Sequence, residues 1–166
     1  MNAQPTTKRT RRGAPPALAA RLVRGEATLA EFAGLGREEL YAIARVGYQL
    51  LNGGRLEDAR AVYRGLAAAD PFDSVFRCHL AAAHLRLGEA EEAVKEFTAA
   101  LRLNVANVDA LSGRGEAHLT RGRVAEAVTD LTQALRLDPE AKRPSTLRAR
   151  ALLVALKEAA DKSSRQ

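Results

Sequence analysis

The apolar residues of this chain recur three and four positions apart over most of its length, a spacing that predicts amphipathic helices. The clearest case is the segment 56–66, in which one helical face carries Leu56, Ala59, Val62, Tyr63 and Leu66. Glycines and prolines interrupt the pattern at intervals, which indicates that each helix is followed by a turn. We therefore expect an all-α fold.

The pattern repeats itself with a period of 34 residues. Small residues, turn glycines and a bulky apolar residue each recur at this spacing, at Gly47, Ala81 and Gly115; at Ala59, Ala93 and Ala127; at Gly54, Gly88 and Gly122; and at Tyr63, Phe97 and Leu131. A period of this length, with small residues where helices touch, is typical of helix–turn–helix pairs stacked into a superhelix. The sequence predicts three such repeats, at 40–73, 74–107 and 108–141.

The segments outside the repeats predict further elements. Residues 17–36 are expected to form a helical extension with short helices at 17–24 and 29–34. The second helix is predicted to begin after Thr28, because Thr28 and Glu31 have the spacing of a capping box. After the repeats, a helix at 144–160 does not repeat the pattern and is expected to cover the apolar end of the superhelix. The division is then a disordered basic tail at 1–16, the extension at 17–36, a repeat domain at 37–160 and a frayed tail at 161–166.

The charge of the chain is concentrated at its start. Of the net charge of +6, the stretch 8–12 supplies four positive charges, so the rest of the 166-residue chain is nearly neutral. Four charges give little affinity for nucleic acid at physiological salt, so the tail alone does not favour a nucleic-acid partner.

The sequence also bears on the compartment. The single cysteine, Cys78, excludes an internal disulfide and suits a reducing environment. No apolar run reaches the roughly 18–20 residues of a membrane span, and the basic start lacks the apolar core of a secretory signal. We therefore expect a cytoplasmic protein without a membrane span.

No motif in the chain indicates chemistry. It lacks a phosphate-binding loop, metal-ligand spacing and a nucleophile motif, so we expect no enzyme, no catalytic residue, no metal and no cofactor. His84 and His118 are repeat-equivalent and occupy a packing position, and Cys78 is expected to be a small buried apolar residue.

A superhelix of this kind presents its first helices on a concave side, where a partner chain can lie. Tyr41 and Tyr48 are seven residues apart on one face and could anchor an extended segment, or instead pack on the N-terminal helices. His79 is a candidate to hydrogen-bond a partner's backbone. The predicted groove residues are Tyr41, Ala44, Tyr48, Leu51 and Asn52 in repeat one, Val75, Cys78, His79, Ala82, Leu85 and Arg86 in repeat two, and Asp109, Ser112 and Glu116 in repeat three.

The small, aromatic and proline positions of the repeat resemble the tetratricopeptide repeat. A narrower resemblance comes from the order of features in 25–41 and 70–76, together with three repeats, two short N-terminal helices and one C-terminal helix. These features resemble the class II chaperones of type III secretion translocators, the SycD/LcrH family. The resemblance implies a cytoplasmic chaperone that keeps hydrophobic translocators soluble before export, and a possible homodimer through 17–36.

Two other functions remain open at this point. The same fold would serve as a general tetratricopeptide-repeat scaffold for protein–protein interaction in another assembly. A co-chaperone that clamps the C-terminal carboxylate of a heat-shock protein would need basic and asparagine side chains in the groove, whereas the corresponding positions here are Ala44, Tyr48, His79, Asp109 and Gly113.

Overall fold

The computed structural model describes residues 16–164, and all regular structure within that range is helical. The helices are α1 (Pro16–Val23), α2 (Leu29–Ala33), α3 (Arg37–Asn52), α4 (Leu56–Ala69), α5 (Ser74–Arg86), α6 (Ala90–Leu103), α7 (Val108–Thr120), α8 (Val124–Leu137) and α9 (Pro144–Ser163). The predicted all-α fold is therefore confirmed. The tail expected at 1–16 falls on residues 1–15, which lie outside the described residues, and on Pro16, which begins α1. Of the frayed tail expected at 161–166, residues 161–163 belong to α9, and 165–166 lie outside the described residues.

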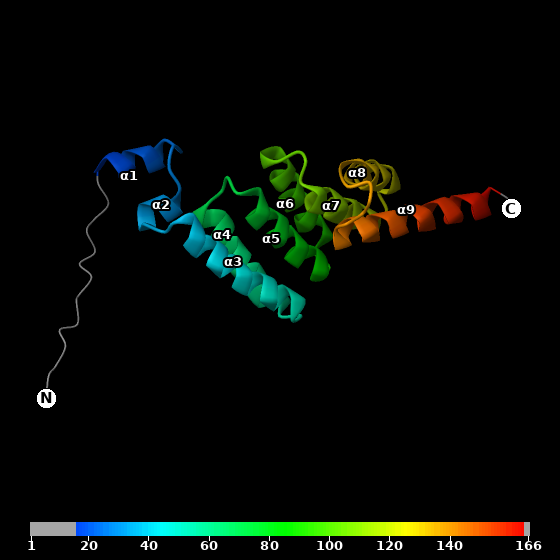
Figure 1. Cartoon of the computed structure of the whole chain (residues 1–166), viewed down its shortest axis with the longest axis horizontal. Helices are drawn as coiled ribbons and strands as arrows, with labels where there is room; N and C mark the ends of the chain where they lie inside the picture. The colour runs from blue at the N-terminus through cyan, green and yellow to red at the C-terminus, as the bar shows by residue number, and fades with distance from the viewer. Residues whose placement is uncertain (1–15, 165–166) are drawn as a thin grey trace, which may run out of the picture.

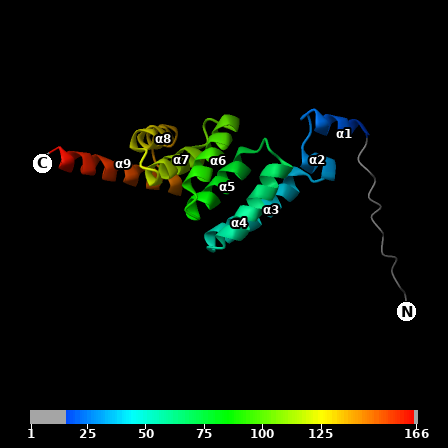
Figure 2. The same cartoon turned by 180° about the vertical axis from the view of Figure 1, so that it is seen from behind.

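The helices from α3 onward form successive antiparallel pairs. Helix α3 packs on α4, α5 on α6 and α7 on α8, while α9 packs on both members of the last pair. Figures 1 and 2 show the pairs following one another along the molecule, with α1 and α2 at one end and α9 extending from the other. The predicted three repeats and capping helix are present in this order.

Local sequence signals set the helix ends. Thr28 and Glu31 form both hydrogen bonds of the predicted capping box at the start of α2. Each repeat turns through a glycine in the left-handed region, with φ of +78° at Gly54, +83° at Gly88 and +71° at Gly122. A side chain would be strained at these angles, which explains why glycine recurs there every 34 residues.

Two helices extend beyond their predicted ends. Helix α3 begins at Arg37 rather than 40, and the carboxylates of Glu38 and Glu39 in its first turn favour this early start. Helix α9 continues to Ser163 rather than 160, because no glycine or proline interrupts it there.

None of the helices between residues 16 and 164 is both long enough and apolar enough to cross a membrane.

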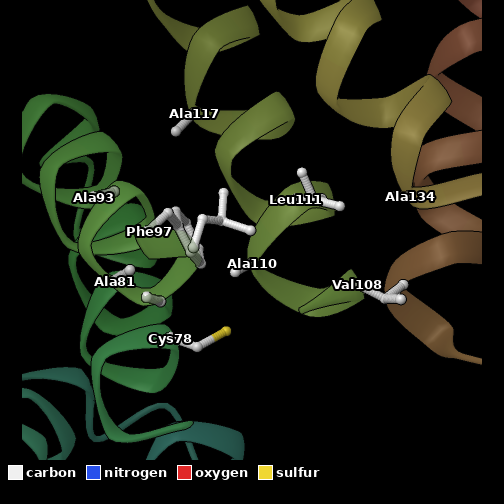
Figure 3. Close-up of a cluster of buried hydrophobic side chains, with 11 residues drawn as sticks. Cys78, Ala81, Ala93, Phe97, Val108, Ala110, Leu111, Ala117 and Ala134 are labelled. Atoms are coloured by element: carbon white, nitrogen blue, oxygen red, sulfur yellow. The ribbon is translucent and has the colours of Figure 1, made fainter. Parts of the chain in front are cut away.

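The core lies between the helix pairs. Its largest cluster joins repeats two and three around Phe97 and Leu111, and most of the other members are alanines (Figure 3). These small side chains let the helix axes approach closely. The tightest approach is at Gly113, where an added Cβ would lie only 2.2 Å from the Phe97 ring. The groove is built on this close helix packing.

Candidate partner-binding groove

A groove of about 620 Å³ runs across the first helices of the repeats and the start of α9. Its lining comprises Tyr48, Leu51 and Asn52 of α3; Cys78, His79, Ala82, Leu85 and Arg86 of α5; Phe97 of α6; Asp109, Gly113 and Glu116 of α7; and Arg143, Pro144, Ser145 and Arg148 at the start of α9. Helices α3, α5 and α7 are the first helices of successive repeats, and α9 packs against α7 in the same series. This arrangement brings the lining residues together.

An aromatic ladder forms one part of the groove. The His79 ring stacks on Tyr63, with ring centroids 4.9 Å apart, and meets the edge of Tyr48 at 6.0 Å. Tyr63 is buried and donates its hydroxyl proton to the Ala44 carbonyl at 2.9 Å, so it is a fixed support. Tyr48 is 53% exposed and is the aromatic surface that a ligand can reach.

His79 offers a hydrogen-bond acceptor to the groove. Its Nδ1 lies 2.9 Å from the Val75 carbonyl oxygen. Because a carbonyl can only accept, Nδ1 must carry the proton, which leaves Nε2 of the neutral ring as an acceptor. An N–H group of a bound backbone is the matching donor.

Charged residues occupy the other part of the groove. Arg143 donates to Asp109 at 2.8 Å, and Arg148 donates through Nε to Glu116 at 3.1 Å. Arg86 donates to the carbonyl oxygen of Leu51, near the C-terminal end of α3. The groove thus has aromatic and apolar residues together with Arg86 toward α3, and most of its charged side chains toward α9.

The repeat pattern of the chain also matches a known protein family. Residues 78–142 match the family model of the tetratricopeptide repeat. This part of the chain is similar to the tetratricopeptide repeat. Among curated proteins, no sequence matches it significantly.

Several solved structures share this fold. A type III secretion system complex from Aeromonas hydrophila gives a TM-score of 0.73 at 22% identity, over 89% of this chain and 99% of that chain. The Yersinia enterocolitica type III secretion chaperone SycD, in complex with a peptide of the translocator YopD, gives 0.66 at 26% identity, over 75% of this chain and 96% of that chain. The first tetratricopeptide domain of Spaghetti (RPAP3), bound to an HSP90 peptide, gives 0.63 at 25% identity, over 74% and 96% respectively. The protein therefore resembles type III secretion chaperones in fold.

The structure brings together ten of the fourteen residues predicted for the groove, and it places four elsewhere. Tyr41 donates its hydroxyl proton to Asp73 at 2.8 Å and packs on Phe76, away from the groove. Val75 lines a smaller hollow of about 190 Å³ that adjoins the groove.

The other two displaced residues are buried between helices. The Ala44 carbonyl accepts the Tyr63 hydroxyl, so this side of α3 faces α4 rather than the groove. Ser112 is fully buried in α7. The simple assignment of one concave face per helix is wrong for these two positions, because part of that face is used for packing between helices.

Sequence reasoning missed the contribution of α9. Its first turns supply Arg143, Ser145 and Arg148 to the groove. One signal could have revealed them: the small-residue position at 47, 81 and 115 recurs once more at Ala149, which is fully buried. Helix α9 therefore packs in the place that a further first helix would take, although its sequence otherwise does not follow the repeat pattern.

The remaining candidates are structural. His84 and His118 are buried, as their packing position predicted, and burial lowers the pKa of His118 despite the nearby Asp130. Burial raises the pKa of the Cys78 thiol to about 12, so it remains protonated at neutral pH. Among the described residues, no three His, Cys, Asp or Glu side chains converge as a metal site would need.

Proposed function

We propose that this protein is a non-enzymatic chaperone that holds an extended, hydrophobic segment of a type III secretion translocator in its groove, in the cytoplasm and before export. The observation that carries the proposal is the likeness to SycD in complex with a peptide of the translocator YopD, which extends over 96% of that chain. The groove of the present chain lies on the first helices of its repeats, the surface that tetratricopeptide superhelices offer to partners.

The chemistry of the groove suits an extended segment. Tyr48, Leu51 and Leu85 provide apolar surface for alternate side chains, while His79 offers an acceptor for a backbone N–H. A strand-like segment has the backbone donors and the two-residue alternation that such a surface requires. Binding would cover apolar surface of the client that otherwise promotes aggregation.

A scaffold role in another assembly is the alternative. The RPAP3 domain shows that this fold also accompanies an HSP90 peptide. The positions compared for a carboxylate clamp, which include Tyr48, His79 and Asp109, contain no lysine or arginine. This composition favours an apolar client over a terminal carboxylate.

Self-association through the N-terminal extension is a separate part of the proposal. Helices α1 and α2 and the turn after α2 expose Val23, Leu29, Phe32 and Leu35. Several exposed large apolar side chains on neighbouring elements are typical of a surface that is covered in a complex. A homodimer through 17–36 would cover them.

The test of the chaperone role is a pull-down from the native cytoplasm with the wild type, Tyr48→Ala and Val46→Ala. Val46 is a matched control because it lies on the same helix as Tyr48 and has a similar exposure, 51% against 53%, but does not line the groove. We expect one or two hydrophobic exported proteins, identified by mass spectrometry, to bind the wild type and Val46→Ala and to be lost from Tyr48→Ala. Capture of unrelated soluble proteins would instead support the scaffold role.

A further inference from the structure

The two ends of the groove differ in charge. At one end the lining residues of α3 are Tyr48, Leu51 and Asn52, none of which is a carboxylate, a lysine or an arginine. Toward the other end lie Asp109 and Glu116 of α7, with Arg143 and Arg148 at the start of α9. A client that lies along the groove therefore passes from apolar residues of α3 to charged residues near α9.

Helix α9 changes the sign of the charge on this surface. The repeats alone contribute one arginine, Arg86, and two carboxylates, Asp109 and Glu116. Helix α9 adds Arg143 and Arg148, each paired with one of these carboxylates. The carboxylates are thereby neutralised, and Arg86, whose recorded hydrogen bond goes to a carbonyl, is left as the excess positive charge.

The arginines keep donors for a ligand. A guanidinium group has five N–H donors, and the recorded contact of Arg148 with Glu116 uses only its Nε. Arg148 is 61% exposed whereas Glu116 is 24% exposed, so the guanidinium rather than the carboxylate is the more accessible member of the pair. An approaching anion meets donors, and an approaching cation meets a carboxylate that already has a partner.

We propose that the groove selects an extended client segment that combines apolar side chains with an acidic one, and that Arg86 and Arg148 attract the acidic side chain. This inference rests on the proposed function and specifies its client. Alternate side chains of an extended segment share one face, so the side chains that face the groove can include apolar residues for Tyr48 and Leu85 and an acidic residue for an arginine. Charge-assisted hydrogen bonds to a carboxylate are stronger than those between neutral groups.

The experiment selects peptides first and then measures charge dependence. A phage-displayed library of short random peptides is panned on the full-length chain, and peptides that also bind Tyr48→Ala are removed. The consensus peptide and the form with its acidic residue changed to the amide are then titrated calorimetrically against the wild type, Arg148→Gln and Arg86→Gln/Arg148→Gln. Arg136→Gln is the matched control, because Arg136 is an exposed arginine in the last turn of α8, away from the groove.

We expect selected peptides to combine apolar residues with Asp or Glu. The double variant should weaken binding of the acidic peptide roughly five- to tenfold, leave the amide peptide unchanged and remove the salt dependence of binding. Unchanged binding of the amide peptide also shows that the groove of the variant is intact. The Arg136→Gln control should match the wild type with both peptides.

Other outcomes separate this inference from the proposed function. Apolar peptides that depend on Tyr48 but show no preference for acidic residues would overturn the inference and leave the groove as a binding site. Enrichment of Lys or Arg would overturn it as well and would assign the recognition to Asp109 and Glu116. If no selected peptide depends on Tyr48, the groove is not the binding surface, and both proposals fail.

Discussion

The close contact between α7 and Phe97 makes Gly113 the most crowded of the glycines that the structure describes. In Gly113→Ala, the new Cβ would lie 2.2 Å from one ring carbon of Phe97 and 2.7 Å and 2.9 Å from two others. Ordinary carbon–carbon contacts are about 3.5–4.0 Å, so the ring must shift by more than about 1 Å. Phe97 is only 1% exposed and packs within the main core cluster, so a shift of its ring disturbs these contacts.

The magnitude follows from two opposing effects. Overpacking of a tight core costs about 1–3 kcal/mol. Alanine in place of a helical glycine returns about 0.5–1 kcal/mol. We therefore expect Gly113→Ala to lower the free energy of unfolding by about 1–2 kcal/mol, which corresponds to a decrease in Tm of roughly 2–8 °C for a chain of this size.

The assay is chemical and thermal unfolding followed by circular dichroism at constant protein concentration. Gly65→Ala is the matched control, because Gly65 lies within α4, is exposed and has nothing within 4 Å of an added Cβ. This control should be more stable than the wild type by about 0.5–1 kcal/mol. The same substitution is thus expected to have opposite signs at the two positions.

A double variant tests the cause. If the Phe97 ring is the obstacle, Phe97→Leu should absorb part of the cost of Gly113→Ala, and the two changes should not be additive. A Gly113→Ala protein that is as stable as Gly65→Ala would refute the reasoning, since it would show that the ring can move freely. Strict additivity would show that the cost arises elsewhere.

Three further outcomes follow from the buried polar groups. Asp130→Asn weakens the two hydrogen bonds that Arg114 donates at 2.7 and 2.8 Å to a buried carboxylate, and should lower the unfolding free energy by about 3 kcal/mol in urea titrations. Burial holds the pKa of His118 below its ordinary value, so its contribution to stability is present above that value of about 6.5 and is lost as the pH falls below it. Unfolding curves between about pH 7.5 and 5.5 should show this loss, and His118→Gln should reduce it. Because burial raises the pKa of the Cys78 thiol to about 12, iodoacetamide should modify Cys78 at mildly alkaline pH only after denaturation, as mass spectrometry would report.

Each of these outcomes has a control or a contrary result. Glu91→Gln breaks an exposed ion pair with Lys95 and should lower the unfolding free energy by only about a few tenths of a kcal/mol. An equally small decrease in Asp130→Asn would contradict the buried-pair argument. An unchanged pH profile in His118→Gln would assign the acid sensitivity to other groups. Rapid alkylation of the native protein would show that Cys78 is reached from the groove.

The periodic features of the fold follow from the sequence because they depend on local chemistry. The 3.6-residue pattern of apolar side chains determines where helices form, and the glycines at 54, 88 and 122 turn the chain in the same way after each first helix. Small residues spaced by 34 identify the contacts between paired helices. Ten groove residues could be predicted on the same basis, since their direction follows from their position on a first helix.

The tertiary structure alone decided how the groove ends and what charge it carries. Arg143 and Arg148 belong to a segment with little of the repeat signature, and they reach Asp109 and Glu116 only because α9 packs against α7 as a fourth first helix. The displacement of Tyr41 and Ser112 has a related cause, because contacts with neighbouring elements occupy the faces that helical periodicity assigned to the groove. A period fixes the direction of a side chain relative to its own helix, whereas its partners depend on how the helices are packed.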